Sequence, residues 1–300
     1  MATKSAFIAI IGKPNVGKSS ILNRLTGSKI AIVSSKPQTT RTKIMGVRTD
    51  GDIQLVFTDT PGFHNAHNKL GEKMNEAVGD SIGGVDACLF VTEPRGELNE
   101  KENELLSMLK KQRMPAILVI NKIDMLGDKA ELLERIKYLA DKFDFEAVVP
   151  CSAQTGDGMK DLMDEMNKLA YDSPHFFPDD TLTDQPERVL AAEMIREKIL
   201  RLMDKEVPHG IAVAIEKMKE RPDGTIMDVD ATIYCERESH KGMVIGKGGA
   251  MLKKISTYAR QDMERFFDCK VNLQLWVKVR KEWRDSELYM KNYGYNQKEI

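Results

Sequence analysis

Short apolar runs alternate with amphipathic stretches through the first half of the chain. The apolar runs are rich in β-branched residues and have the length of buried strands. The stretches between them have helical periodicity. Strands that alternate with helices predict βαβ units, and therefore an α/β domain with a mostly parallel, doubly wound sheet. The predicted strands are AFIAII (6–11), IQLVFTD (53–59), ACLFVTE (87–93), PAILVIN (115–121) and EAVVP (146–150), and two of the helical stretches are EKENELLSMLKKQ (100–112) and KAELLERIKYLADKF (129–143).

The pattern changes after residue 172. Residues 172–187, DSPHFFPDDTLTDQPE, contain three prolines and several acids, which is typical of an ordered linker. Beyond it the periodicities predict a helix over 186–206, strands over 210–220 and 226–237, two helices and a strand over 270–279. This α-β-β-α-α-β order predicts a smaller α+β domain with helices on one face of its sheet. The expected organisation is a first domain over 1–172, a linker over 173–185 and a second domain over 186–300.

Composition narrows the function classes. A chain of 300 residues exceeds one ordinary core, which supports two domains. The net charge of −1 gives no global indication of a polyanionic partner, so any nucleic-acid site must be local. Four scattered cysteines and five scattered histidines show neither disulfide nor zinc spacing. No apolar run approaches the roughly 18 residues of a spanning helix. We expect a cytoplasmic protein, and a peripheral membrane contact stays open.

A phosphate-binding loop follows the first predicted strand. Residues 12–19 fit G-x-x-x-x-G-K-S, and the helical stretch SSILNRLTG comes next. Glycines let backbone N–H groups surround the phosphates, and the helix N-terminus favours negative charge. In this pattern Lys18 reaches the β- and γ-phosphates and Ser19 binds Mg²⁺. An ordinary glycine turn does not account for the strand and helix on either side. The expected nucleotide contacts here are Gly12, Lys13, Pro14, Asn15, Val16, Gly17, Lys18, Ser19 and Ser20.

The next motifs select guanine over adenine. Asp59-Thr60-Pro61-Gly62 ends a strand, so Asp59 is expected to hold Mg²⁺ through water, with the Gly62 N–H near the γ-phosphate. Asn121-Lys122-Ile123-Asp124 ends another strand. The Asp124 carboxylate only accepts hydrogen bonds, which suits the paired donors of guanine. Asn121 is expected either to take part in base binding or to tie the loop together, and Lys122 is expected to cover the ring.

The CSAQTG segment completes this series after the last strand. In it, Ser152 and Ala153 are expected at the base, with the Ala153 N–H recognising guanine O6. A single motif of this kind can be a polar strand end. Four motifs in order, each at the carboxyl end of a strand, indicate a nucleotide site.

Together these motifs resemble the translation-factor-related P-loop GTPases over residues 5–170. The stretch KPQTTRTKIMG (36–46) is similar to the first switch of that family, which implies that Thr40 is a Mg²⁺ ligand. Thr39 is the close alternative, and an ordinary loop is the other interpretation. The bound species implied are GTP or GDP with Mg²⁺.

The hydrolytic machinery departs from the Ras-like pattern. Phe63 stands where Ras-like enzymes have a water-orienting glutamine, and its ring cannot orient water by hydrogen bonding. In related GTPases with the PNVGKS pattern, an asparagine helps bind K⁺, so we hypothesise that role for Asn15. His64 is a second candidate near the water, although a loop histidine without a role is favoured. The expected catalytic set is Lys18, Thr40, Gly62 and Asn15.

A second glycine loop, Gly246-Lys247-Gly248-Gly249, lacks the context of a nucleotide loop. It lies between two predicted helices after an apolar MVI, which is the arrangement of the GxxG loop in a KH module. Such a loop clamps about four unpaired nucleotides. A helix–helix turn with solvated lysines is the alternative, but the α-β-β-α-α-β order favours a type II KH fold. No acid occurs between 241 and 254, and the expected RNA contacts are Lys241, Val244, Ile245, Gly246, Lys247, Gly248, Gly249, Lys253 and Lys254.

The stretch LWVKVRKEW (275–283) admits two interpretations. Its two tryptophans and three cations would extend the basic surface, while a strand with alternating core and solvent positions explains the same residues.

A GTPase domain followed by a type II KH module resembles the Era family of bacterial GTPases over nearly the whole chain. The resemblance rests on GKPNVGKSS, PQTTR, DTPGFH, NKID, SAQTG, HFFPDD, IREKI, VIGKGG and LWVKV. It implies a GTPase that binds the 3′ end of 16S rRNA and acts in 30S subunit assembly and rRNA maturation, with peripheral contact to the inner membrane. We expect a monomer. The alternative function is a regulatory or membrane-associated switch whose KH fold binds protein or lipid. A metabolic ATPase or kinase is disfavoured by NKID.

Overall fold

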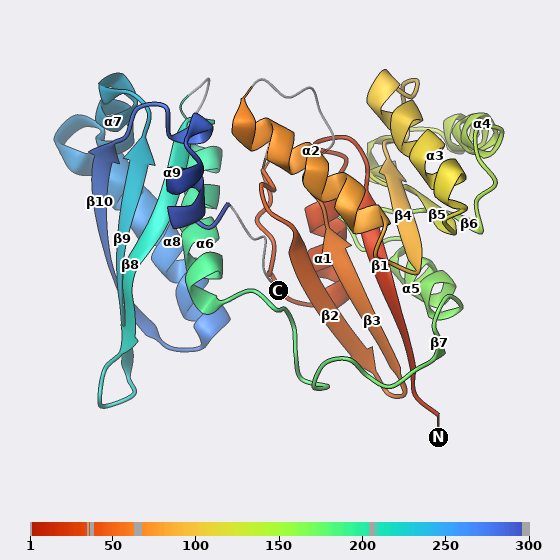
Figure 1. Ribbon diagram of the computed structural model, residues 1–300, viewed down its shortest axis with the longest axis horizontal. Helices are drawn as coiled ribbons and strands as arrows, with labels where there is room; N and C mark the ends of the chain where they lie inside the picture. Colours follow the sequence, from red (N-terminus) through yellow and green to blue (C-terminus); the bar gives the residue numbers. More distant parts are fainter. Residues whose placement is uncertain are drawn as a thin grey trace. The chain divides into compact units, whose positions relative to one another are not determined.

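The chain forms two compact units in the computed structural model (Figure 1). The structure describes residues 2–34, 36, 39–62, 68–203, 207 and 209–295. Unit 1 takes its residues from 1–31, 40–66 and 71–184, and unit 2 from 32–39, 67–70 and 185–300. The segment 32–39 therefore belongs with the second unit although it lies early in the sequence.

The sheet of unit 1 is mostly parallel, as the sequence predicted. Its order is β2-β3-β1-β4-β5-β6, and β7 pairs with β1. The edge strand β2 runs antiparallel to β3, and β7 runs antiparallel to β1. All other pairings are parallel. The strands are β1 (Lys4–Ile11), β2 (Ile44–Asp50), β3 (Ile53–Asp59), β4 (Ala87–Thr92), β5 (Ala116–Ile120), β6 (Ala147–Pro150) and β7 (Tyr171–Asp172).

Helices cover both faces of this sheet (Figure 1). On one face, α2 (Lys69–Ile82), α3 (Glu100–Gln112) and α4 (Lys129–Ala140) pack against the strands around buried Phe90 and Leu118. On the other face, α1 (Lys18–Thr26) contacts β1, β2 and β3 and pairs with α5 (Met159–Asn167). The pattern of buried apolar residues on every central strand is the reason that both faces need cover.

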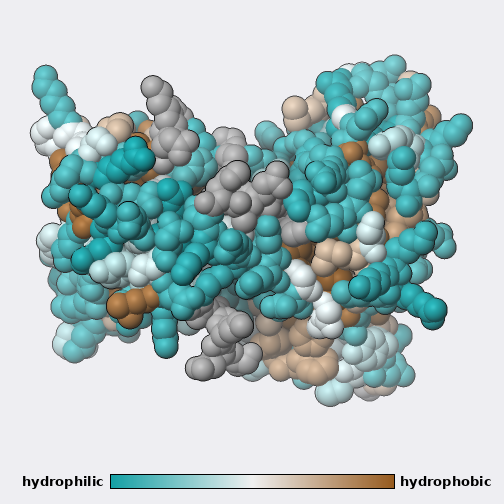
Figure 2. Space-filling view, turned by 45° about the horizontal axis from the view of Figure 1, so that its top comes forward, coloured by the Kyte–Doolittle hydropathy of each residue, from teal (hydrophilic) through white to brown (hydrophobic). Residues whose placement is uncertain are grey.

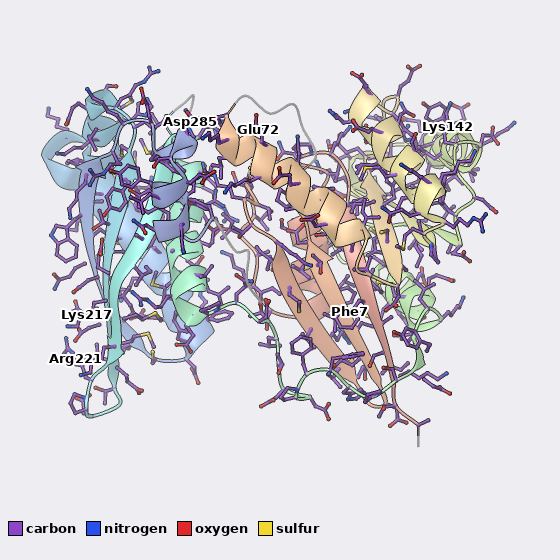
Figure 3. All side chains as sticks on the ribbon, in the orientation of Figure 1. Phe7, Glu72, Lys142, Lys217, Arg221 and Asp285 are labelled. Carbon is purple, nitrogen blue, oxygen red and sulfur yellow. The ribbon has the colours of Figure 1, made fainter. Side chains whose placement is uncertain are left out.

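The proline-rich segment 173–184 is ordered on unit 1. Gln54 accepts hydrogen bonds from the Phe176 and Phe177 N–H groups at 2.8 and 3.0 Å. The ring of Phe176 meets that of Phe7 edge to face, with centroids 4.9 Å apart; Figure 3 labels Phe7 on β1. Further along, the Val47 N–H donates to the Leu182 carbonyl at 2.9 Å. The segment extends unit 1 up to Asp184.

Unit 2 has the predicted α-β-β-α-α-β order. The sheet order is β10-β9-β8, with β9 antiparallel to β8 and parallel to β10. Helices α6 and α8 lie on one face around the core residues Ile195, Ile233 and Ala259. The elements are α6 (Glu187–Leu202), β8 (Ile211–Glu220), β9 (Ile226–Cys235), α7 (Glu238–Ile245), the 3₁₀ turn η2 (Lys247–Gly249), α8 (Ala250–Phe267), β10 (Lys270–Val279), the 3₁₀ turn η3 (Trp283–Asp285) and α9 (Glu287–Asn292).

The two tryptophans of 275–283 have different environments. Trp276 on β10 is 45% exposed, while Trp283 is fully buried and donates its indole N–H to the Gly210 carbonyl at 3.1 Å. Lys278 and Arg280 share the exposed positions with Trp276. Strand alternation therefore explains this stretch up to Arg280, and Trp283 is a core residue.

Polar side chains dominate the visible surface of the molecule in Figure 2, with small apolar areas between them. Figure 3 places Arg221 at the β8–β9 turn, where its guanidinium pairs with Asp228 at 2.8 Å. That pair, followed by a hydrogen bond from Asn272, lowers the pKa of Asp228 to about 2. Within the described ranges, we find no helix with the length and apolarity needed to span a bilayer.

Candidate nucleotide site and RNA-binding loop

The phosphate loop joins β1 to α1 at the carboxyl edge of the sheet. Lys18, the first residue of α1, is buried and donates to the carbonyls of Gly12 and Lys13 at 3.0 and 3.1 Å. Burial lowers the pKa of Lys18 to about 8, and the nearby charge of Asp59 opposes that shift. An anionic phosphate would offset the same desolvation, so the lysine is placed for a γ-phosphate.

Gly17 is required at the start of α1. It has a φ of 101°, and a Cβ there would lie 2.2 Å from the Asn121 side-chain nitrogen. Only glycine adopts this conformation without strain and admits the Asn121 amide. The phosphate loop and the base-binding loop are therefore packed directly against each other.

The three predicted Mg²⁺ ligands meet at one point. The Ser19 hydroxyl donates to Asp59 Oδ2 at 2.6 Å, the Thr40 hydroxyl donates to the same oxygen at 3.2 Å, and the two hydroxyls are 2.9 Å apart. Burial raises the pKa of Asp59, while Lys18, Ser19 and Thr40 lower it in part. Asp59 Oδ1 is buried and accepts no hydrogen bond from the residues that the structure describes. An uncompensated carboxylate oxygen beside two hydroxyls fits a hard divalent cation such as Mg²⁺.

The remaining residues of the first two motifs are supporting groups or loop backbone. Val16 is fully buried, and the Thr60 hydroxyl donates to the Ile10 carbonyl at 2.9 Å, so both hold the loops. Gly62 lies against Pro14, where a Cβ would be 2.7 Å from the proline ring. The loop backbone also includes Lys13, Asn15 and Pro61, and Ser20 lies in the first turn of α1. Phe63 and His64, discussed above for hydrolysis, lie outside the described residues.

Asn121 ties the nucleotide loops together. Its amide donates to the Val16 carbonyl at 2.7 Å, and its Oδ1 accepts from the Ala153 N–H at 3.0 Å. The side chain is 2% exposed. Of the two roles open to Asn121, the structure supports the tie. It also gives the Ala153 N–H a partner within the protein, so its recognition of guanine O6 stays a prediction.

Asp124 and Lys122 lie in the same base-binding loop, directly after β5. The Ser152 hydroxyl donates to Asp124 Oδ1 at 2.5 Å, which orients the carboxylate predicted to read guanine. Lys122 has a φ of 67°, a left-handed conformation uncommon for a lysine, at the start of the turn η1 (Ile123–Met125). Its ammonium donates to Glu93 at 2.7 Å.

Two supporting residues escaped the sequence reasoning. Arg24 on α1 donates to the carbonyls of Ala153 and Gln154 at 2.8 and 2.7 Å and so holds the CSAQTG segment. Glu93 directly follows β4 and pairs with Lys122 and Lys13. The sequence could have indicated Glu93, because it stands at the carboxyl end of a strand, as Asp59 and Asn121 do. It could not have indicated Arg24, since one polar residue on a helix looks like any solvated side chain.

The second glycine loop has the local geometry of a phosphate-binding turn. Gly246, Gly248 and Gly249 have φ values of 71°, 58° and 80°. At Gly246 a Cβ would lie 2.7 Å from the Met251 Cβ, so glycine is needed where the turn meets α8. The loop ends at the N-terminus of α8, a helix of 18 residues whose first N–H groups favour an anion.

The predicted RNA-binding residues divide into exposed and buried groups. Lys247, Lys253 and Lys254 are exposed, and Lys241 and Ile245 are half-buried. Val244 is fully buried in the core of unit 2. We therefore correct its assignment from RNA contact to packing. Its neighbour Met243 is 49% exposed and offers an apolar side chain at that surface.

Comparison with known proteins supports both domains. Residues 7–122 match the family described as a 50S ribosome-binding GTPase, and residues 206–284 match the KH domain family. The chain is 48% identical to GTPase Era of Clostridioides difficile over 295 residues, covering 98% of this chain and 99% of the relative. It is 49% identical to GTPase Era of Clostridium kluyveri over 292 residues, covering 97% and 99%.

Solved structures agree over the same length. An Aquifex aeolicus Era variant bound to GDP and AlF₄⁻ superposes with a TM-score of 0.94 at 36% identity, covering 98% of this chain and 99% of that one. Era in complex with MgGDPNP and nucleotides 1506–1542 of 16S ribosomal RNA gives the same TM-score, identity and coverage. With the phosphate loop, the guanine motifs and the GxxG loop all in place, the chain belongs to the Era family of GTPases.

Proposed function

We propose that this protein hydrolyses GTP and binds the 3′ end of 16S rRNA during assembly of the small ribosomal subunit and rRNA maturation. The observation that carries the proposal is the presence, on one chain, of a complete guanine-nucleotide site and a GxxG loop with exposed lysines. A family member has been solved with MgGDPNP and this part of 16S rRNA bound together.

The nucleotide chemistry rests on groups already gathered in unit 1. Lys18 supplies positive charge to the γ-phosphate, and Asp124 accepts from the guanine edge. Ser19, Thr40 and Asp59 would hold Mg²⁺, which neutralises charge developing on the phosphates. Thr40 is preferred over Thr39 because its hydroxyl donates to Asp59.

Asn15 is our candidate for a K⁺ site. It is exposed on the phosphate loop with a φ of 66°, a conformation that asparagine tolerates. A K⁺ held there would supply the positive charge of an arginine finger. Turnover measured in K⁺ and Na⁺ buffers tests this, with a K⁺ stimulation that Asn15→Ala abolishes as the expected result. Equal turnover in both buffers would reject the cation.

The RNA would lie along the GxxG loop and α8. The Gly249 N–H already donates to the Gly246 carbonyl at 3.2 Å. Phosphates would therefore contact the Gly248 N–H and the first turn of α8, and Lys247, Lys253 and Lys254 would add electrostatic attraction. Met243 offers an apolar surface to the bases. Because three lysines face solvent, affinity should fall steeply as salt is raised.

Nucleotide state would control RNA affinity through the first switch. Thr40, with its hydroxyl on Asp59, belongs to unit 1, while Thr39 belongs to unit 2. Loss of the γ-phosphate would release Thr40 and alter the segment attached to it. The coupling is measured as the ratio of the RNA affinities of the GTP-bound and GDP-bound protein.

The decisive experiment measures binding of a 16S rRNA 3′-end oligonucleotide by fluorescence anisotropy, with GDP or GDPNP bound. We expect about tenfold tighter binding with GDPNP, within the usual range of allosteric coupling. Gly248→Asp should abolish binding in both states. Gly51→Asp is the matched control, because Gly51 has a φ of 59° against 58° for Gly248 and both have open space where a Cβ would lie.

Equal RNA affinity with GDP and GDPNP would reject the coupling. Unchanged affinity in Gly248→Asp would reject the RNA site itself. A KH fold that binds protein or lipid is not favoured, since a solved relative holds RNA.

We further propose a cytoplasmic monomer with a peripheral contact to the inner membrane. Native mass measurement should return one chain of 33.9 kDa. Sedimentation with vesicles of bacterial lipid tests the membrane contact, which we expect to be reversed by salt.

A further inference from the structure

One carboxylate joins two of the nucleotide-binding loops. Glu93 Oε2 lies 3.2 Å from the Lys13 ammonium on the phosphate loop, and Glu93 Oε1 accepts from the Lys122 ammonium of the base-binding loop at 2.7 Å. Each carboxylate oxygen thus holds a different lysine. The three side chains are 22–32% exposed, so the contacts are partly shielded from water.

The backbone of Glu93 is fixed by a buried arginine. Arg135 on α4, which is 6% exposed, donates from Nε to the Glu93 carbonyl at 3.1 Å and from Nη2 to the Thr92 hydroxyl at 3.1 Å. Its Nη1 donates to the Gly96 carbonyl. Arg135 therefore holds the backbone of the loop after β4, from which the Glu93 carboxylate reaches the two lysines.

The lysines need such a partner because their flexible stems can adopt many rotamers. Ordering one costs up to about 2 kcal/mol of conformational entropy. Lys13, Lys122 and the nearby Lys18 also bring three positive charges to one edge of the sheet. A carboxylate between two of them offsets their repulsion and selects one rotamer for each.

Glu93 is suited to this role because it stays ionised. Partial burial raises its pKa, but the hydrogen bonds and charges of Lys122 and then Lys13 outweigh burial, and the pKa of Glu93 is lowered overall.

We propose that Glu93 is a positioning residue for guanine-nucleotide binding. It holds the Lys122 stem along the face of the guanine ring and Lys13 beside the phosphate loop, and it thereby sets how long the nucleotide remains bound. The inference rests on guanine-nucleotide binding alone and is independent of the RNA site.

A neighbouring ion pair shows what makes Glu93 different. Arg95 and Glu131 form a two-bonded pair at 2.8 and 3.1 Å, with side chains 58% and 43% exposed. Neither residue belongs to a nucleotide motif. Exposed pairs of this kind contribute little to stability, so Glu131 is a matched control carboxylate.

The test measures dissociation of a fluorescent GDP from purified full-length protein. Glu93→Gln keeps the size of the side chain and removes its charge. We expect GDP to dissociate about fivefold to tenfold faster, as for the loss of two partly shielded ion pairs. The single-turnover rate of cleavage of bound GTP should stay within twofold, because the hydrogen bonds and ion pairs of Glu93 in the described part of the chain are to Lys13, Lys122 and Arg135 and not to Lys18 or the Mg²⁺ ligands. Glu131→Gln should leave both rates unchanged.

Two further readouts separate positioning from general loosening. Lys122 covers the ring without reading its exocyclic groups, so Glu93→Gln should weaken GDP and IDP by the same factor. A smaller ratio of GDP affinity to IDP affinity in Glu93→Gln would mean that Asp124 has moved, and it would overturn the proposal. In a Lys13→Gln/Lys122→Gln background, Glu93→Gln should have no further effect. A full effect in that background, or unchanged GDP dissociation in the single variant, would also overturn it.

Discussion

Replacing Asn121 with alanine should separate the two nucleotide loops. The Asn121 amide satisfies the Val16 carbonyl at 2.7 Å and the Ala153 N–H at 3.0 Å, and both contacts are buried. Asn121→Ala leaves these two backbone groups without their partner. Each unsatisfied buried group costs about 1–3 kcal/mol, so the site should lose about 2–6 kcal/mol. At the lower limit this weakens GDP binding by about 30-fold.

The assay combines a GDP titration with urea unfolding of the nucleotide-free protein. Asn103→Ala is the control, because the Asn103 side chain also bonds two backbone groups, in its case the carbonyls of Leu98 and Asn99, but on the exposed surface of α3. We expect a large loss of affinity for Asn121→Ala and less than a twofold change for Asn103→Ala. GDP affinity within threefold of wild type in Asn121→Ala would refute the tie as the main role of this side chain.

Three further predictions test other parts of the molecule. Asp59→Asn should reduce GTP turnover at least about 100-fold, measured by phosphate release across a Mg²⁺ titration, because it removes the carboxylate at the proposed cation site. Gly246→Ala, strained by its φ and by contact with Met251, should weaken RNA binding in an anisotropy titration while GDP affinity stays unchanged. His175 contacts two acceptors, Asp179 Oδ1 at 2.7 Å and the Asp52 carbonyl at 3.2 Å, and both favour the imidazolium form. The hydrogen bond to Asp179 is the main reason that the pKa of His175 is raised above its ordinary value of about 6.5. The stabilisation is therefore present below the unfolded-state pKa and is lost as pH rises through the folded-state pKa; thermal unfolding at a series of pH values should show that fall, and a profile identical to that of His175→Gln would contradict it.

Local sequence accounted for most elements that carry chemistry. Strands β3 and β10 and helix α3 begin and end where the pattern placed them, because each has a clear apolar period. Helix α3 also has a capping box, in which Asn99 accepts from the Glu102 N–H at 2.9 Å and Glu102 accepts from the Asn99 N–H at 3.0 Å. Strand β2 was not predicted. It lies at the edge of the sheet, and the polar residues on its more exposed half interrupt the apolar pattern. The sequence analysis also predicted no helix at the positions of α2 and α9.

The sequence alone determined the two folds and the types of residue at both glycine loops, because glycine spacing, strand ends and apolar period are properties of neighbours along the chain. Only the tertiary structure decided which residues that are distant along the chain come into contact. It brought Asn121 to Val16, Glu93 to two lysines and Arg24 to Ala153, and it buried Val244. These contacts depend on how parallel strands align their carboxyl ends and on how helices pack on the sheets. Residues distant in sequence therefore share one site, and no local sequence pattern encodes which of them contact each other.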